Sequence, residues 1–159
     1  MKHVTVLYDP TCGFCVSCRQ WLSKQPKWIE MHFVPQGSSR AKRLFPTLTC
    51  RADDQGRPDE LVVVDDRGQV YRDDKAWVIC FYALRDFRGL SMKLARPGMA
   101  KLARRAYTLI SGNRRAISTL IGADRKAVRM LEEAEDDPGC HNALCALKQA
   151  KARVAEDVA

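Results

Sequence analysis

The chain has 159 residues and a formal net charge of +8. Its length and its 46% of hydrophobic residues are sufficient for one domain with a buried core. Its longest apolar runs, such as the LVVV at residues 61–64, are far too short to span a bilayer. The first residues, MKHVTVLYD, contain no apolar signal-peptide core, so we expect a cytoplasmic globular protein without a transmembrane segment.

The N-terminal third predicts a strand, a helix and a second strand. Residues 3–9 alternate between apolar and polar side chains and are rich in β-branched residues, which is typical of a strand. Residues 14–24 have apolar residues at helical spacing, and Pro26 ends that helix. Residues 28–34 alternate again and predict the second strand.

The middle of the chain predicts a short helix, a β-hairpin and a longer helix. The short helix lies around residues 38–45. Two strands, 61–65 and 69–72, flank DRG, a sequence typical of hairpin turns. Asp73 or Asp74 then caps a helix whose apolar residues recur at i, i+3, i+4 and i+7: Trp77, Cys80, Phe81 and Leu84.

The C-terminal part predicts only helices. They occupy residues 97–112, 113–122 and 124–135 and the stretch from about 141 towards 154, with breaks at Gly112 and at DDPG. In the first of them, one face carries the apolar side chains of Met99, Leu102, Ala106, Leu109 and Ile110.

The order of these elements predicts the fold class. A long helical connection favours parallel pairing of the first two strands, and the hairpin pairs the last two antiparallel. The resulting β-α-β-β-β-α order, with a Cys pair directly after the first strand, resembles a thioredoxin-like α/β domain with a mixed sheet. We expect this domain in residues 1–90 and an all-helical C-terminal extension, packed on or beside it, in residues 91–159.

The stretch LYDPTCGFCVSC contains the candidate reactive groups. Cys12 lies in the turn at the start of the predicted helix and Cys15 one turn inside it. The free N–H groups and the aligned peptide dipoles of a first helical turn stabilise a thiolate, which is the form of cysteine that attacks disulfides. We therefore predict a thiol–disulfide oxidoreductase with Cys12 as the attacking thiol and Cys15 as the resolving thiol.

Two other interpretations of the CxxC stay open. The spacing is also common in zinc sites, and a buried Cys often serves only as a small core residue. Cys18 is one turn further along the helix, where a bridge to Cys15 would be strained, so packing is the favoured interpretation of Cys18.

Several of these segments are similar to a known family. LYDPTCGFC resembles the motif of the DCC family of thiol-disulfide oxidoreductase-like proteins, with Asp9, Cys12 and Cys15 at its three defining positions. VYRDDKAWV and AYTLISGNRRAIS resemble later segments of that family. The resemblance covers roughly residues 3–122 and implies a thioredoxin-like fold and disulfide oxidoreductase activity. This sequence has Pro10 where the family usually has Gly.

Four further residues are assigned around the Cys pair. Asp9 can accept a proton from Cys15, or it can simply bond backbone N–H groups in the turn. Pro58 is the candidate for the cis-proline that thioredoxin-like proteins carry near the Cys pair. Asp73 and Asp74 stand where glutaredoxins hold the glutathione amino group, with helix capping as the alternative.

The remaining cysteines form the basis of a rival hypothesis. Cys50 and Cys80 have no evident partner and are assigned to packing. In GCHNALC, His141 and Cys145 share a helical face and could complete a zinc site with the N-terminal pair, whereas Cys140 and Cys145 are too far apart to bridge. The alternative protein is thus a non-enzymatic, zinc-stabilised binding module; the favoured one needs no cofactor.

The charge is unevenly distributed. Between Arg85 and Arg129 there are twelve Lys or Arg and two acidic residues, and Arg104, Arg105, Arg114 and Arg115 cluster. Such a surface suits an anionic partner, in addition to the predicted protein or glutathione-type disulfide substrate.

Overall fold

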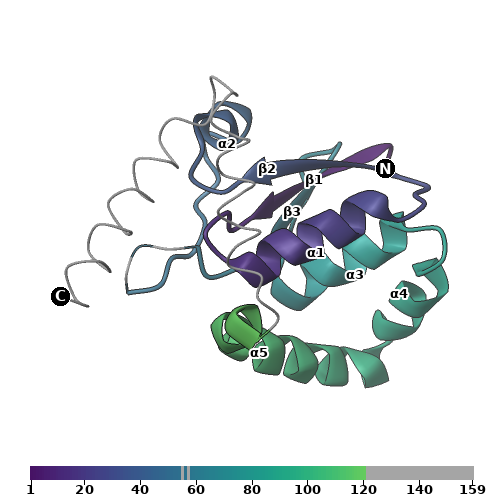
Figure 1. Cartoon of the computed structure of the whole chain (residues 1–159). Coiled ribbons are helices and arrows are strands. Elements are labelled where there is room, and N and C mark those ends of the chain that lie inside the picture. The colour runs from purple at the N-terminus through teal and green to yellow at the C-terminus, as the bar shows by residue number, and fades with distance from the viewer. Residues whose placement is uncertain (55, 57, 121–159) are drawn as a thin grey trace.

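The structure of the chain, a computed structural model, describes residues 1–54, 56 and 58–120. A four-stranded mixed sheet lies at its centre (Figure 1). The strands are β1 (His3–Tyr8), β2 (Glu30–Pro35), β3 (Val62–Asp65) and β4 (Val70–Arg72), in the spatial order β2-β1-β3-β4. β1 and β2 are parallel, whereas β1–β3 and β3–β4 are antiparallel. The predicted mixed α/β sheet is therefore confirmed, and it is consistent with a thioredoxin-like fold.

The helices lie on both faces of this sheet. Helices α1 (Gly13–Lys24) and α3 (Asp73–Ala83) lie between the sheet and α5 (Pro97–Leu120), as Figure 1 shows. The short helix α4 (Arg88–Leu94) joins α3 to α5, and α2 (Ser39–Leu44) packs against β2. Because α5 contacts both α1 and α3, the described part of the extension covers the side of these helices that faces away from the sheet.

Strand alternation divides the core into two layers. Val6 and Val63 face α1 and α3, in a cluster that also contains Leu22 and Cys80. The second cluster lies on the α2 side of the sheet and consists of Leu7, Val34, Ala41, Val62 and Val64. In the hairpin between β3 and β4, Gly68 has φ 79°, a left-handed conformation that glycine adopts without steric cost. The β-branched runs seen in the sequence thus give the two inner strands, each with both faces buried.

Three details of the sequence prediction are wrong. The predicted break at Gly112 is absent, since α5 continues to Leu120 and the Asn113 amide donates to the Leu109 carbonyl one turn back, at 2.8 Å. The helix α4 was not predicted. Arg72, and neither Asp73 nor Asp74, is the N-cap of α3, and its side chain makes no capping hydrogen bond. The helices predicted at 124–135 and 141–154 lie outside the described residues.

Among residues 1–54, 56 and 58–120, no helix is both long enough and apolar enough to cross a membrane.

Candidate functional site

The turn between β1 and α1 is built around Asp9. Its carboxylate is almost fully buried, and Oδ1 accepts hydrogen bonds from the Thr11 backbone N–H at 2.8 Å and from the Thr11 hydroxyl at 2.7 Å. This is the side-chain-to-backbone bonding that Asp makes in tight turns. Asp9 thereby fixes the direction in which the chain leaves the sheet and enters α1. The turn-forming interpretation of Asp9 is therefore confirmed by its contacts.

Cys12 is the N-cap of α1. Its backbone is extended (φ −97°, ψ 110°), and its Sγ accepts a hydrogen bond from the Cys15 backbone N–H at 3.5 Å. A residue in this position faces the free N–H groups of the first turn, which favour a negative charge. Cys12 is 7% exposed and Cys15 is partly buried, so only a small part of Cys12 is accessible.

The two cysteines shift each other's pKa in opposite directions. The hydrogen bond that Cys12 accepts from the Cys15 thiol, with a smaller contribution from the Cys15 N–H, lowers the pKa of Cys12 to about 7 against the opposing effect of burial. The same contact with Cys12, together with burial, raises the pKa of Cys15 well above its usual range. One thiolate therefore forms near neutral pH, and it forms on Cys12.

A pH profile of alkylation follows from these pKa values. As pH rises through about 7, Cys12 loses its proton, so its reaction with iodoacetamide should reach half its maximal rate there. Cys18, whose pKa burial raises to about 12, should stay unmodified over the same range. Peptide mapping by mass spectrometry measures both rates in one sample. Equal alkylation of the two thiols at neutral pH would contradict the assignment.

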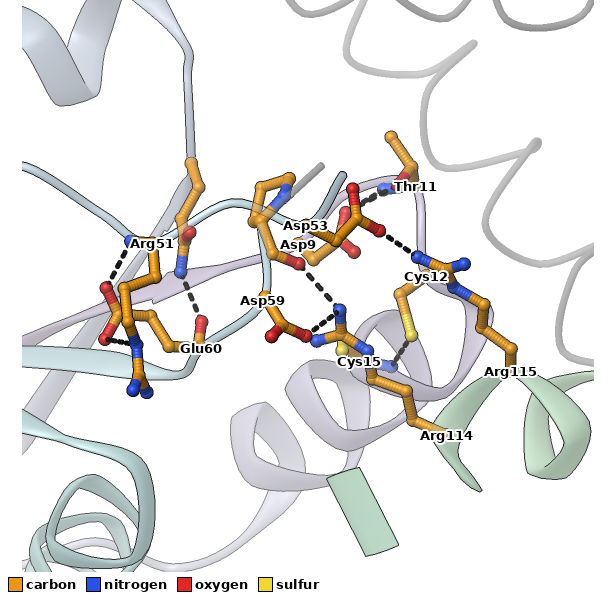
Figure 2. A network of polar contacts seen from close by, with 12 residues as sticks. Asp9, Thr11, Cys12, Cys15, Arg51, Asp53, Asp59, Glu60, Arg114 and Arg115 are labelled. Carbon is orange, nitrogen blue, oxygen red and sulfur yellow. Dashed lines mark hydrogen bonds and ion pairs between the residues drawn. The ribbon is translucent and has the colours of Figure 1, made fainter. Parts of the chain in front are cut away.

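Arg114 is a site residue that the sequence analysis placed only in a basic cluster. It extends from α5, and its Nη2 donates to the Pro58 carbonyl at 2.7 Å and to Asp59 Oδ1 at 3.1 Å. Figure 2 shows its guanidinium beside Cys15, while the next residue, Arg115, forms an ion pair with Asp53. The side chain of Arg114 is largely buried, and its positive charge acts to lower the pKa of both cysteines.

The other predicted site residues, Pro58, Asp73 and Asp74, differ in how they contact the region of the Cys pair. Pro58 contributes its carbonyl as the anchor for Arg114; the peptide bond before it involves Arg57 and lies outside the described residues. Asp73 accepts hydrogen bonds from Arg51 Nη2 at 2.6 Å and from the Tyr107 hydroxyl at 3.1 Å, so it is engaged within the chain. Asp74 lines the same cavity as Asp9 and Cys15. The use of Asp73 and Asp74 in substrate binding stays a prediction.

The remaining described cysteines have the environment of packing residues. Cys80 is fully buried, and that burial raises its pKa to about 12. Burial also raises the pKa of Cys50. Within the described ranges, no three His, Cys, Asp or Glu side chains are grouped as a metal site requires. Cys140, His141 and Cys145, on which the zinc hypothesis depends, lie outside those ranges.

The class of protein follows from the fold and the position of the cysteines: an α/β protein, consistent with a thioredoxin-like fold, with two cysteines at the start of its first helix. The model of the DCC1-like thiol-disulfide oxidoreductase family matches residues 6–120, and the chain belongs to this family. Asp9, Cys12, Cys15 and Arg114 all fall within the match. No curated protein and no solved structure matches the chain. Family membership indicates a thiol–disulfide redox function.

Proposed function

We propose that the protein catalyses thiol–disulfide exchange in the cytoplasm, with Cys12 as the attacking thiol and Cys15 as the resolving thiol. The observation that carries this proposal is the place of Cys12 as the N-cap of α1, where its Sγ accepts a hydrogen bond from the Cys15 N–H and its pKa is lowered while that of Cys15 is raised. Only a thiolate attacks a disulfide, and a thiol with a pKa near ambient pH is close to the optimum for attack. The substrate is a protein disulfide or a low-molecular-weight disulfide.

The reaction consists of two exchanges. The Cys12 thiolate attacks one sulfur of the substrate disulfide, forms a mixed disulfide and releases the other half as a thiolate, which then takes a proton. Cys15 loses its proton and attacks Cys12 Sγ, which releases the second half of the substrate. The substrate gains two electrons and two protons, and the protein is left with a Cys12–Cys15 disulfide. A dithiol reductant must reverse that oxidation before the next turnover.

Asp9 is the proposed acceptor of the Cys15 proton. Both residues line the same cavity, and the negative charge of Asp9 acts to raise the pKa of Cys15. A carboxylate in that position can take the proton when Cys15 attacks. Asp73 and Asp74 are proposed as contacts for the substrate at the start of α3.

Equilibration in glutathione buffers tests the proposal. After acid quenching and alkylation, mass spectrometry should show Cys12 and Cys15 converting together as a two-electron couple, at a potential between roughly −120 and −270 mV. The proposed pair works without a metal, so metal analysis should find none. A pair that resists alkylation, retains zinc and loses its fold with a chelator would instead establish the zinc-stabilised module.

Substitution of Arg114 tests the electrostatic part of the proposal. Arg114→Gln removes a buried positive charge, so the pKa of Cys12 should rise and its alkylation at about pH 6 should slow, by about tenfold for each unit of rise. Arg114→Lys keeps the charge and should recover part of the rate. Arg115→Gln, at the exposed neighbouring position, is the matched control. Equal profiles for the Arg114→Gln and Arg115→Gln variants would remove Arg114 from the site.

A further inference from the structure

An apolar cavity of about 310 Å³ lies where α1, α3 and α5 meet. Its walls are mostly aliphatic and aromatic side chains: Leu22, Trp77, Val78, Phe81, Leu94 and Ile110. Asp9, Cys15 and Arg114 also line it, and Cys12 lies next to this wall, since its Sγ accepts a hydrogen bond from the Cys15 N–H at 3.5 Å. α5, from the C-terminal part of the chain, thus completes a chamber beside the proposed redox site.

The size and the chemistry of this cavity restrict what it can bind. Small-molecule sites typically measure about 300–1,000 Å³, and an apolar cavity of roughly 150 Å³ is enough for benzene. The chamber therefore has room for one ring or a short alkyl chain. Glutathione carries two carboxylates and an ammonium group, and transferring charged groups against apolar walls is strongly unfavourable. Only its sulfur end would suit the polar side of the chamber.

We propose that the cavity binds the apolar substituent of a low-molecular-weight alkyl or aryl disulfide while Cys12 attacks its sulfur. This inference rests on the proposed function and names the substrate class. The Cys12 thiolate displaces one thiolate from the disulfide and keeps the apolar half as a mixed disulfide, with its substituent against Phe14 and Cys15 on the cavity wall. Cys15 then releases that half as a thiol and closes the Cys12–Cys15 bond.

Alkyl 2-pyridyl disulfides of increasing chain length provide the test. The reduced protein is mixed with the ethyl, butyl and hexyl compounds, with carboxyalkyl compounds of equal length and with glutathionyl 2-pyridyl disulfide, and the released thiopyridone is followed by absorbance. We expect the second-order rate constant to rise by up to about fourfold per buried methylene in the neutral series, until the cavity is full. The carboxyalkyl and glutathionyl compounds should show no such rise.

Two alanines of α5 provide a matched pair of variants. Ala103 lines the cavity, whereas Ala116 is exposed on the same helix and does not. Ala103→Leu should flatten the chain-length dependence, whereas Ala116→Leu should leave the chain-length dependence of the wild-type protein unchanged. A wild-type rate that is independent of chain length, with an intact Cys12–Cys15 couple, would overturn this inference alone. If the wild-type protein reacted with none of these disulfides, the proposed function would be overturned as well.

A different observation concerns the outer surface of α4 and α5. Residues 88–120 contain no Asp or Glu and eight Lys or Arg, of which Arg114 is buried and Arg115 forms an ion pair with Asp53. Leu102, Leu109 and Leu120 are 57%, 67% and 86% exposed, and Met92 of α4 is also exposed. Leu102 and Leu109 are seven residues apart and so share one face of α5, opposite the buried Arg114 and Ser118. Arg105 stands three residues after Leu102 and four before Leu109, so this face of α5 carries a basic side chain between two exposed leucines.

We infer that this face of α5 docks on the surface of an anionic lipid bilayer. Basic side chains are attracted to acidic headgroups, while leucines on the same helix enter the boundary between headgroups and acyl chains. A second copy of the chain would bring two basic surfaces together, and an RNA would leave the leucines without apolar contacts. The charge and the exposed leucines together thus favour the bilayer over these two partners.

Co-sedimentation with vesicles tests the docking. The protein should bind vesicles of phosphatidylcholine with phosphatidylglycerol, should not bind phosphatidylcholine alone, and should dissociate at about 0.5 M salt. Leu102→Ser with Leu109→Ser, or Arg104→Gln with Arg105→Gln, should each weaken binding by about tenfold or more, whereas Ala116→Ser should not. Absence of vesicle binding would overturn the inference, as would a dimer in gel filtration, or RNA binding, that depends on the same leucines.

Discussion

Cys12→Ser is expected to reduce disulfide exchange to the rate of the enzyme-free control. A hydroxyl in the N-cap position still accepts the hydrogen bond from the Cys15 N–H, so α1 should remain intact. It does not ionise near neutral pH, however, and Cys15 cannot replace it, because the burial of Cys15, which does not depend on Cys12, also raises the pKa of Cys15. Turnover of a small disulfide with a dithiol reductant measures the loss, and circular dichroism checks the fold.

The matched variant Cys15→Ser should behave differently. Cys12 can still attack and form the mixed disulfide, but nothing releases the bound half, so the substrate should accumulate covalently on Cys12 with a stoichiometry of one. The hydroxyl introduced by Cys15→Ser can still donate a hydrogen bond to Cys12 Sγ, so this attack should still proceed at neutral pH. If the Cys12→Ser and Cys15→Ser variants trapped substrate equally, the assignment of the two roles would be wrong.

The sequence alone was sufficient to predict the mixed sheet and the position of Cys12 and Cys15 at the start of the first helix. Strand alternation and the hairpin turn are local signals, and the position of Cys12 follows from where β1 ends and α1 begins. These patterns predicted the order of the elements, the mixed sheet and the place of the Cys pair at the helix terminus. The family resemblance added Asp9, whose turn-forming hydrogen bonds connect residues only two positions apart.

What the sequence did not reveal depends on contacts between distant segments. Arg114 reaches Pro58 and Asp59 across more than fifty residues, and nothing in GNRRAIS distinguishes it from the exposed Arg115. The Gly112–Asn113 pair is a typical helix end, yet packing of α5 on α1 and α3 keeps the helix continuous through it. Glu60 follows a polar stretch of the sequence, and its burial depends on two distant arginines, Arg51 and Arg72, that converge on its carboxylate.

Arg72→Met is expected to lower the free energy of unfolding by about 3 kcal/mol, because it leaves the Glu60 carboxylate with fewer partners in a fully buried position. The Glu60 side chain has no exposed surface; Arg72 Nη1 forms an ion pair with its Oε1, and the Arg51 backbone N–H donates to the same oxygen at 2.6 Å. Arg51 Nε lies 3.3 Å from Oε2 and keeps part of the charge compensated. That remaining partner sets the cost at the lower end of the range of about 3–5 kcal/mol for breaking a buried ion pair.

Urea unfolding of a double-mutant cycle isolates this contribution. Glu60→Gln in the Arg72→Met background replaces the buried charge by a neutral amide and should recover part of the lost stability, so the two substitutions should be non-additive by about 1 kcal/mol or more. Arg67→Met, an exposed arginine in the turn between β3 and β4, is the control and should change stability by no more than about 0.5 kcal/mol. Equal unfolding midpoints for the Arg72→Met and Arg67→Met variants would show that water, rather than Arg72, compensates Glu60. Glu60 also lines the cavity beside Cys15. Measuring the alkylation rate of Cys12 in the same variants therefore separates the effect of Glu60 and Arg72 on stability from their effect on the reactivity of the Cys pair.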